Sequence, residues 1–168
     1  MDDYTNNCGP TAITNLIGMI GSYKNYSRIT SENYSDIFLA VADYGVKNKY
    51  FNEASGSCLG TLDSYIAGSF GLYGVNATVT SKDATFNNVK SELTNHRPFY
   101  LSLNQHSYYG DHGVVGYAYT RLQSETTGYY LSFIKIADGE ALYGRYLDIA
   151  CIDEHNEAIL RTININNL

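Results

Sequence analysis

The hydrophobic pattern of the chain changes near Pro98, and this change limits the fold more than any other feature. Before Pro98, apolar residues recur at helical spacing. This pattern predicts helices over 8–22, from a cap at Ser31 to about 46, over 58–70 and from Asp83 to about 95, with a short strand at 75–80.

After Pro98, short runs rich in Val, Ile, Tyr and Phe are separated by Gly, Asn, Asp or Ser, which is typical of strands. The predicted strands are 99–104, 112–120, 128–138, 144–151 and 157–165. Helices followed by a run of strands indicate an α+β protein, with N-terminal helices packed on a C-terminal antiparallel β-sheet.

Size and charge exclude several classes of protein. A chain of 168 residues with 44% hydrophobic residues suits a single domain over 1–168 with a real core. No run approaches the ~18 apolar residues of a membrane span, so membrane insertion is not expected. A net charge of −6 without a cluster of Lys or Arg argues against a nucleic-acid partner.

Tyrosine dominates the aromatic residues, with 17 tyrosines and no tryptophan. Tyrosine suits strands with one wet face, or a groove that grips peptides or sugars. Because only 17% of residues are charged, we expect a secreted or cell-surface protein. The acidic start Met1-Asp2-Asp3 is not a signal peptide, so we expect a mature fragment or a trimmed form.

The segment Asn7-Cys8-Gly9-Pro10-Thr11-Ala12 places a cysteine where a helix begins. Asn7 is a good N-cap residue, and proline is tolerated only in the first helical turn. A thiol at this position faces backbone N–H groups and the positive end of the helix dipole, which favour the thiolate. Cys8 is therefore a candidate nucleophile.

The other two cysteines, Cys58 and Cys151, are interpreted as small core residues. A disulfide between Cys58 and Cys151 stays an alternative, although no sequence feature supports it. No pair of Cys or His has the spacing of zinc ligands, and we expect no metal or other cofactor.

A thiolate needs a base, and His112 has the best setting among the four histidines. It opens the apolar strand pattern His112–Thr120, so its side chain is expected at a sheet edge. His106 is the alternative, in the polar loop before it. His96 is interpreted as a structural residue at a helix end, and His155 as part of a polar turn.

Asp138 is the candidate partner of His112. It ends the strand pattern 128–138, which would form a hairpin with the pattern 112–120 and bring the carboxylate close to the ring. A carboxylate there would hold the tautomer and steady the positive charge of the imidazole. Asp138 as a plain turn residue before Gly139 remains an alternative.

The order Cys8, His112, Asp138 resembles the papain-like cysteine peptidases, in the bacterial branch related to the double-glycine leader peptidases. The resemblance rests on Asn7-Cys8-Gly9-Pro10-Thr11-Ala12, on His112-Gly113-Val114-Val115-Gly116-Tyr117 and on the segment from Ile134 to Gly139 followed by Gly144-Arg145-Tyr146. It implies the papain-like fold and a hydrolase that cleaves peptide bonds through a thioester, with Cys8 as nucleophile, His112 as base and Asp138 as its orienting residue.

The chain departs from that family at the oxyanion donor. The family places a Gln shortly before the nucleophile, and Asp2 holds that position here. A carboxylate accepts hydrogen bonds and does not donate them, so Asn6 or a residue outside this sequence would have to act with the Cys8 N–H. The departure motivates an alternative, a catalytically degenerate peptide-binding module. A transglutaminase or amidase also stays open, because motifs do not name the acceptor.

Overall fold

The computed structural model describes residues 6–29, 33–154 and 158–165, which form two compact units. The first unit comprises residues 1–80 and 163–168, and the second comprises 81–162. The helices are α1 (Cys8–Lys24), α2 (Tyr34–Lys47), the 3₁₀ helix η2 (Leu59–Thr61), α3 (Leu62–Gly71), α4 (Phe86–Thr94) and α5 (Ile149–Glu154). The strands are β1 (Phe51–Asn52), β2 (Gly56–Ser57), β3 (Ala77–Asp83), β4 (Phe99–His106), β5 (Gly110–Gln123), β6 (Tyr130–Ala137), β7 (Arg145–Asp148) and β8 (Ala158–Ile165).

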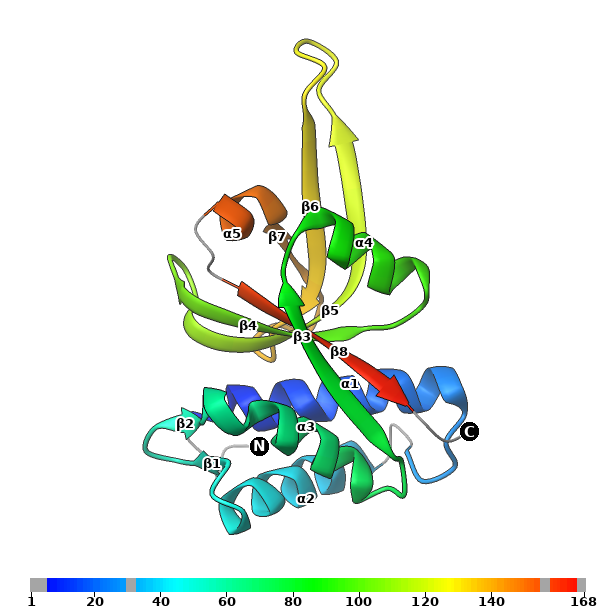
Figure 1. Cartoon of the computed structure of the whole chain (residues 1–168), viewed down its shortest axis with the longest axis vertical. Helices are drawn as coiled ribbons and strands as arrows, with labels where there is room; N and C mark the ends of the chain where they lie inside the picture. The colour runs from blue at the N-terminus through cyan, green and yellow to red at the C-terminus, as the bar shows by residue number, and fades with distance from the viewer. Residues whose placement is uncertain (1–5, 30–32, 155–157, 166–168) are drawn as a thin grey trace. The chain divides into compact units, whose positions relative to one another are not determined.

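The first unit is helical (Figure 1). Helices α1, α2 and α3 contact one another, and the two-stranded hairpin β1–β2 lies against α1 and α2. Most apolar residues of α1 are buried, as their helical spacing predicts: Ala12, Ile13, Leu16, Ile17 and Ile20. Tyr65 on α3 is also buried, and its hydroxyl donates a hydrogen bond of 2.9 Å to the carbonyl oxygen of Val41. The phenol is thus satisfied inside the core.

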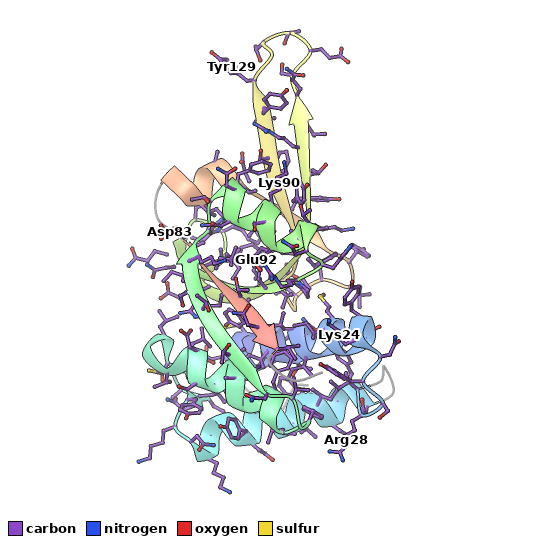
Figure 2. The ribbon with its side chains drawn as sticks, turned by 45° about the vertical axis from the view of Figure 1, so that its right-hand side comes forward. Lys24, Arg28, Asp83, Lys90, Glu92 and Tyr129 are labelled. Atoms are coloured by element: carbon purple, nitrogen blue, oxygen red, sulfur yellow. The ribbon has the colours of Figure 1, made fainter. Side chains whose placement is uncertain are left out.

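The second unit is built on an antiparallel sheet with the strand order β3-β8-β4-β5-β6-β7. Strands β3 and β8 each continue from one unit into the other. The α+β class expected from the sequence is confirmed. Strands β5 and β6 form a long hairpin, with Tyr129 near its tip (Figures 1 and 2).

Two glycines of β5 allow aromatic rings to lie on the strand. A Cβ atom at Gly113 would meet the hydroxyl of Tyr100, and one at Gly116 would meet the ring of Phe99. Both aromatic residues belong to the neighbouring strand β4 and are buried. A larger residue at either glycine would have to displace a core side chain.

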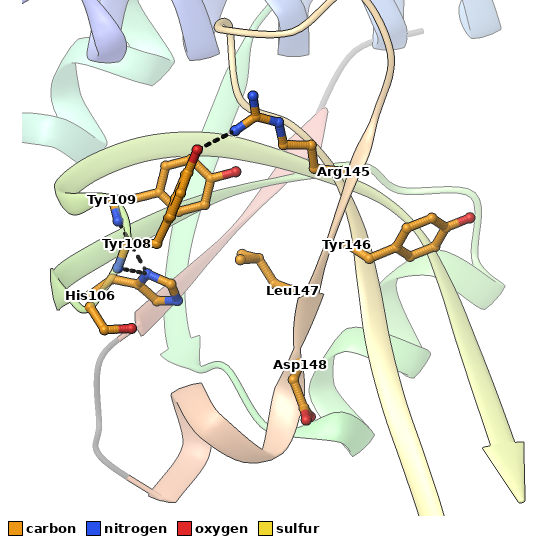
Figure 3. A pocket seen from close by; sticks show the side chains of 8 residues that line it. His106, Tyr108, Tyr109, Arg145, Tyr146, Leu147 and Asp148 are labelled. Atoms are coloured by element: carbon orange, nitrogen blue, oxygen red, sulfur yellow. Dashed lines mark hydrogen bonds between the residues drawn. The ribbon is translucent and has the colours of Figure 1, made fainter.

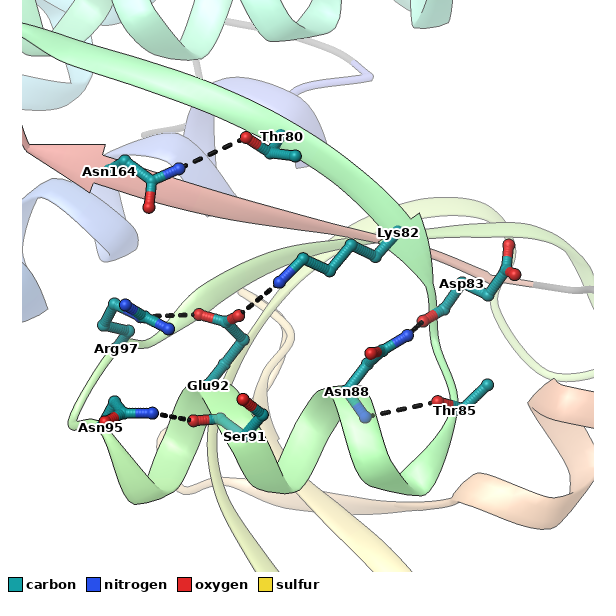
Figure 4. A network of polar contacts seen from close by, with 10 residues as sticks. All are labelled: Thr80, Lys82, Asp83, Thr85, Asn88, Ser91, Glu92, Asn95, Arg97 and Asn164. Carbon is teal, nitrogen blue, oxygen red and sulfur yellow. Dashed lines mark hydrogen bonds and ion pairs between the residues drawn. The ribbon is translucent and has the colours of Figure 1, made fainter.

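A buried carboxylate ties α4 to the chain on both sides of it (Figure 4). Glu92 is fully buried, and it forms ion pairs of 2.8 Å with Lys82 of β3 and with Arg97 before β4. Burial raises the pKa of Glu92, but the hydrogen bonds and charges of the two cations outweigh it, and the pKa lies below the ordinary 4.5. The ionised form is therefore the one that the fold stabilises.

Two boundaries predicted from the sequence are wrong. Asp83 ends β3 instead of starting a helix, and α4 is capped by Thr85, whose side chain accepts the N–H of Asn88 at 3.3 Å. The strand expected over 144–151 stops at Asp148, and α5 follows. There the carboxylate of Asp148 accepts the N–H of Ala150 at 3.0 Å, which favours a helix start. The cap expected at Ser31 lies outside the described residues.

Candidate functional site

Cys8 is the first residue of α1, and its exposure is intermediate. The carbonyl of Asn7 accepts the first helical hydrogen bond, from Thr11 N–H at 2.9 Å, and Pro10 lies in the first turn. Asn7 is the N-cap residue, although its side chain makes no capping hydrogen bond. The helix start predicted at Cys8 is confirmed. At this position the sulfur lies beside the positive end of the α1 dipole.

Asn6, the candidate oxyanion donor, has a left-handed backbone with a φ of 51°. Its side-chain amide donates a hydrogen bond of 2.6 Å to the carbonyl of Glu53 in the β1–β2 turn. One of its N–H groups therefore anchors the hairpin beside α1. Asp2, which holds the donor position of the family, lies outside the described residues, and the oxyanion role of Asn6 stays a prediction.

His112 lies within β5, two residues after the strand begins, opposite Leu103 of β4. Its Nε2 atom is 3.0 Å from the main-chain carbonyl oxygen of Asp138. Because a carbonyl oxygen only accepts, Nε2 carries the hydrogen in this bond. In the neutral ring Nδ1 is then the basic nitrogen.

Asp138 directly follows β6 and is 3% exposed. The β5–β6 hairpin brings it to His112, as expected. The contact is different from the one expected, because the ring meets the carbonyl and the carboxylate has other partners. Its Oδ1 atom accepts the N–H groups of Glu140 and Ala141, both at 3.1 Å. Its Oδ2 atom accepts the Tyr109 hydroxyl at 2.9 Å and lies 3.3 Å from Nε of Arg145.

These contacts keep the Asp138 carboxylate ionised. Burial raises its pKa, but the N–H of Glu140, the hydroxyl of Tyr109, the N–H of Ala141 and the charge of Arg145 outweigh it. The net pKa lies below the ordinary value of 3.8.

Tyr109 and Arg145 complete this cluster, and the sequence analysis assigned neither of them a role. The ring of Tyr109 stacks on that of His112, with centroids 5.3 Å apart and planes 19° apart. Arg145 also lies 3.6 Å from the carboxylate of Glu140. The only sequence signal was their place in tyrosine-rich segments beside His112 and after Asp138.

His106, the alternative base, is used by the turn between β4 and β5. Its Nδ1 atom accepts the backbone N–H groups of Tyr108 and Tyr109, at 3.2 and 3.3 Å. Its ring also contacts Tyr109, with centroids 5.5 Å apart. These bonds indicate that His106 shapes the turn that carries Tyr109.

A pocket of about 490 Å³ opens between this turn and β7 (Figure 3). Its lining includes Tyr108, Tyr109, Arg145, Tyr146 and Leu147. The Leu147 side chain points into the space between the two segments, and Nη1 of Arg145 donates to the Tyr108 hydroxyl at 3.2 Å. Tyr109 thus lines the pocket and also stacks on His112.

Cys58 differs from its predicted core position, because it is exposed. It caps η2, and hydrogen bonds from the side chain of Thr61 and the N–H of Gly60 lower its pKa. Cys58 is a free thiol. The side chain of Cys151, its proposed disulfide partner and the other predicted core cysteine, lies outside the described part of the chain. Exposure and a lowered pKa make Cys58 a reactive thiol, which sequence reasoning missed.

The three predicted catalytic residues are divided between the units. Cys8 belongs to the first unit, and His112 and Asp138 belong to the second. Within the described parts of the chain, no group of three or more His, Cys, Asp or Glu side chains could hold a metal ion. No described helix has both the length and the apolar character needed to cross a bilayer.

Comparisons of the chain with protein-family models, with curated proteins and with solved structures gave no match.

Proposed function

We propose that the chain is a papain-like cysteine peptidase that cleaves peptide bonds, with Cys8 as nucleophile and His112 as its acid–base partner. The observation that carries the proposal is the 3.0 Å contact between His112 Nε2 and the Asp138 carbonyl. It leaves Nδ1 as the nitrogen that can exchange a proton with a thiol. The start of α1 at Cys8 supports the choice of nucleophile.

In the proposed reaction, the Cys8 thiolate attacks the carbonyl carbon of the scissile amide. The His112 imidazolium then gives its Nδ1 proton to the leaving amine, and a thioester remains on Cys8. His112 next takes a proton from water, whose oxygen attacks the thioester; the acid and the Cys8 thiolate are released, and His112 is again an imidazolium. The N–H of Cys8 would donate to the developing oxyanion.

The pocket beside Tyr109 is the proposed site for a side chain of the peptide substrate. Its volume lies within the range of about 300–1,000 Å³ that is usual for ligand sites. Aromatic and aliphatic walls with a few fixed polar groups suit a peptide better than a phosphate-rich ligand. The expected environment is extracellular or at the cell surface, as the composition indicates.

A second candidate is a peptide-binding module that has lost catalysis. It is favoured by the position of Asp2 and by the Asn6 amide, which already holds the β1–β2 turn. A binding module would hold peptides without hydrolysing them, and Cys8→Ala would leave their affinity unchanged.

The first test compares two single cysteine variants. At pH 7, iodoacetamide should label Cys8 in the native protein, and Cys8→Ser should abolish both this labelling and the hydrolysis of a peptide library. Cys58→Ser is the matched control, because it removes an exposed thiol with a lowered pKa and should leave hydrolysis unchanged. Hydrolysis that survives Cys8→Ser would overturn the assignment.

The second test asks whether Cys8 and His112 meet, which the proposal requires. In a Cys58→Ser background, mild oxidation of His112→Cys should form a disulfide between Cys8 and the introduced cysteine, because such a bond needs Cα atoms within about 7 Å. Mass spectrometry of the linked peptides identifies the bond. His106→Cys is the control and should form less of it. An equal yield from both variants would contradict the proposed pairing.

A further inference from the structure

We infer that Asp138 positions His112 through its main-chain carbonyl, and that the Asp138 carboxylate, Tyr109 and Arg145 act together to hold that carbonyl in place. The catalytic role of this positioning rests on the proposed function, in which His112 is the acid–base residue. The predicted geometry can nevertheless be measured on a protein without activity.

The turn after β6 is closed by the side chain of Asp138. Oδ1 of Asp138 accepts the N–H groups of Glu140 and Ala141, so the side chain closes a tight turn over its own following residues. Gly139 within the turn has a φ of 78°, in the left-handed region that glycine adopts without strain. The peptide between Asp138 and Gly139 carries the carbonyl that meets His112, so the turn fixes the direction of that carbonyl.

The other carboxylate oxygen of Asp138 is anchored by two residues from different segments. Oδ2 is held by the Tyr109 hydroxyl from the β4–β5 turn and by Arg145 from the start of β7. These two residues come from opposite sides of Asp138 in the sequence, and together they join three segments of the second unit. Because the carboxylate is 1% exposed and ionised, removing either donor would leave part of its charge unmatched.

Tyr109 makes a double contact, with His112 and with Asp138. Its ring covers one face of His112, while its hydroxyl holds the residue whose carbonyl accepts from the same imidazole. Ring and acceptor are therefore fixed by one side chain. Tyr109 and Arg145 are positioning residues for His112, and their rings and side chains also line the pocket proposed for the substrate.

The test measures the exchange of the His112 Nε2 hydrogen with water in protein labelled with ¹⁵N-histidine. At pH 8 the resonance should be sharp, and a His112→Gln variant assigns it by its loss. Tyr109→Phe keeps the stacked ring but removes the hydroxyl, and it should speed this exchange at least about tenfold, as the loss of one buried hydrogen bond implies. Asp138→Asn and Arg145→Met should act in the same direction.

Tyr146→Phe is the matched control, because it makes the same chemical change on β7 at an exposed residue. It should leave the Nε2–H exchange unchanged. Backbone amide exchange in β5 and β6 must stay slow in every variant, which separates positioning from unfolding. If peptide hydrolysis is measurable, Tyr109→Phe should lower kcat while KM changes little.

Rapid Nε2–H exchange in the native protein, or exchange unaffected by Tyr109→Phe and Asp138→Asn, would overturn the inference. Such a result would leave the proposed peptidase intact if Cys8→Ser still abolished hydrolysis. Slow exchange in a protein without hydrolysis would support the inference and contradict the proposed function.

Discussion

Glu92 is a fully buried acid whose two cationic partners, Lys82 and Arg97, are each more than one-third exposed. Replacing the carboxylate by an amide leaves both cations without their anion and places an uncharged group between them. The free energy of unfolding of Glu92→Gln should therefore fall by about 3 kcal/mol, at the lower end of the range for breaking a buried ion pair, because water can reach both cations.

Urea unfolding at pH 7 measures this change. Glu140→Gln is the matched control, since the side chain of Glu140 is half exposed and its contact with Arg145 is 3.6 Å long. An exposed pair of this kind contributes at most about 1 kcal/mol. Equal losses in the two variants would contradict the importance given to burial.

Sequence reasoning reached part of the candidate site at this residue scale. It placed Cys8 at a helix start and Asp138 beside His112, because both follow from local patterns of helix and hairpin. It did not identify the carbonyl as the acceptor, nor the part played by Tyr109 and Arg145. These depend on the turn after β6 and on contacts between residues up to 36 positions apart, such as that between Tyr109 and Arg145, which local patterns do not encode.

At the scale of elements, long periodic segments were predicted well and short connecting segments poorly. Helix α1 and the β5–β6 hairpin match their sequence patterns because many residues contribute to each. The region after β7 failed because Ile149, Ala150 and Cys151 suit a strand or a buried helix equally. A single capping contact from Asp148 accompanies the change to α5. Cys58 failed similarly, because its exposure at the start of η2 depends on tertiary packing.

At the scale of the molecule, two ionised acids make the second unit sensitive to low pH. Glu92 and Asp138 both belong to residues 81–162, and both have a pKa below the ordinary values of 4.5 and 3.8. An acid whose pKa is lower in the folded state stabilises the fold at any pH above its pKa in the unfolded state. This contribution is lost as the pH falls through the pKa of the folded state. Stability should therefore be constant near pH 6 and should decline below about pH 4.5.

Urea unfolding followed between pH 6 and pH 3 tests this expectation, with backbone amide exchange in β5 and β6 reporting on the second unit. The Glu92→Gln variant should show a shallower decline, because it has lost one of the two titrating groups. Stability that rises as pH falls from 4.5 to 3 would contradict the signs of both pKa shifts.

The two glycines of β5 make its His-Gly-Val-Val-Gly sequence weaker evidence of homology. Gly113 and Gly116 are required because Tyr100 and Phe99 of the neighbouring strand fill the space that a Cβ atom at each position would need. An unrelated sheet with the same aromatic neighbours would need the same spacing of glycines. In a search for relatives, the informative positions are therefore those whose residue type is not required by packing. These are His112, two residues into its strand, and Asp138, whose carboxylate closes a turn while its main-chain carbonyl accepts a hydrogen bond from His112.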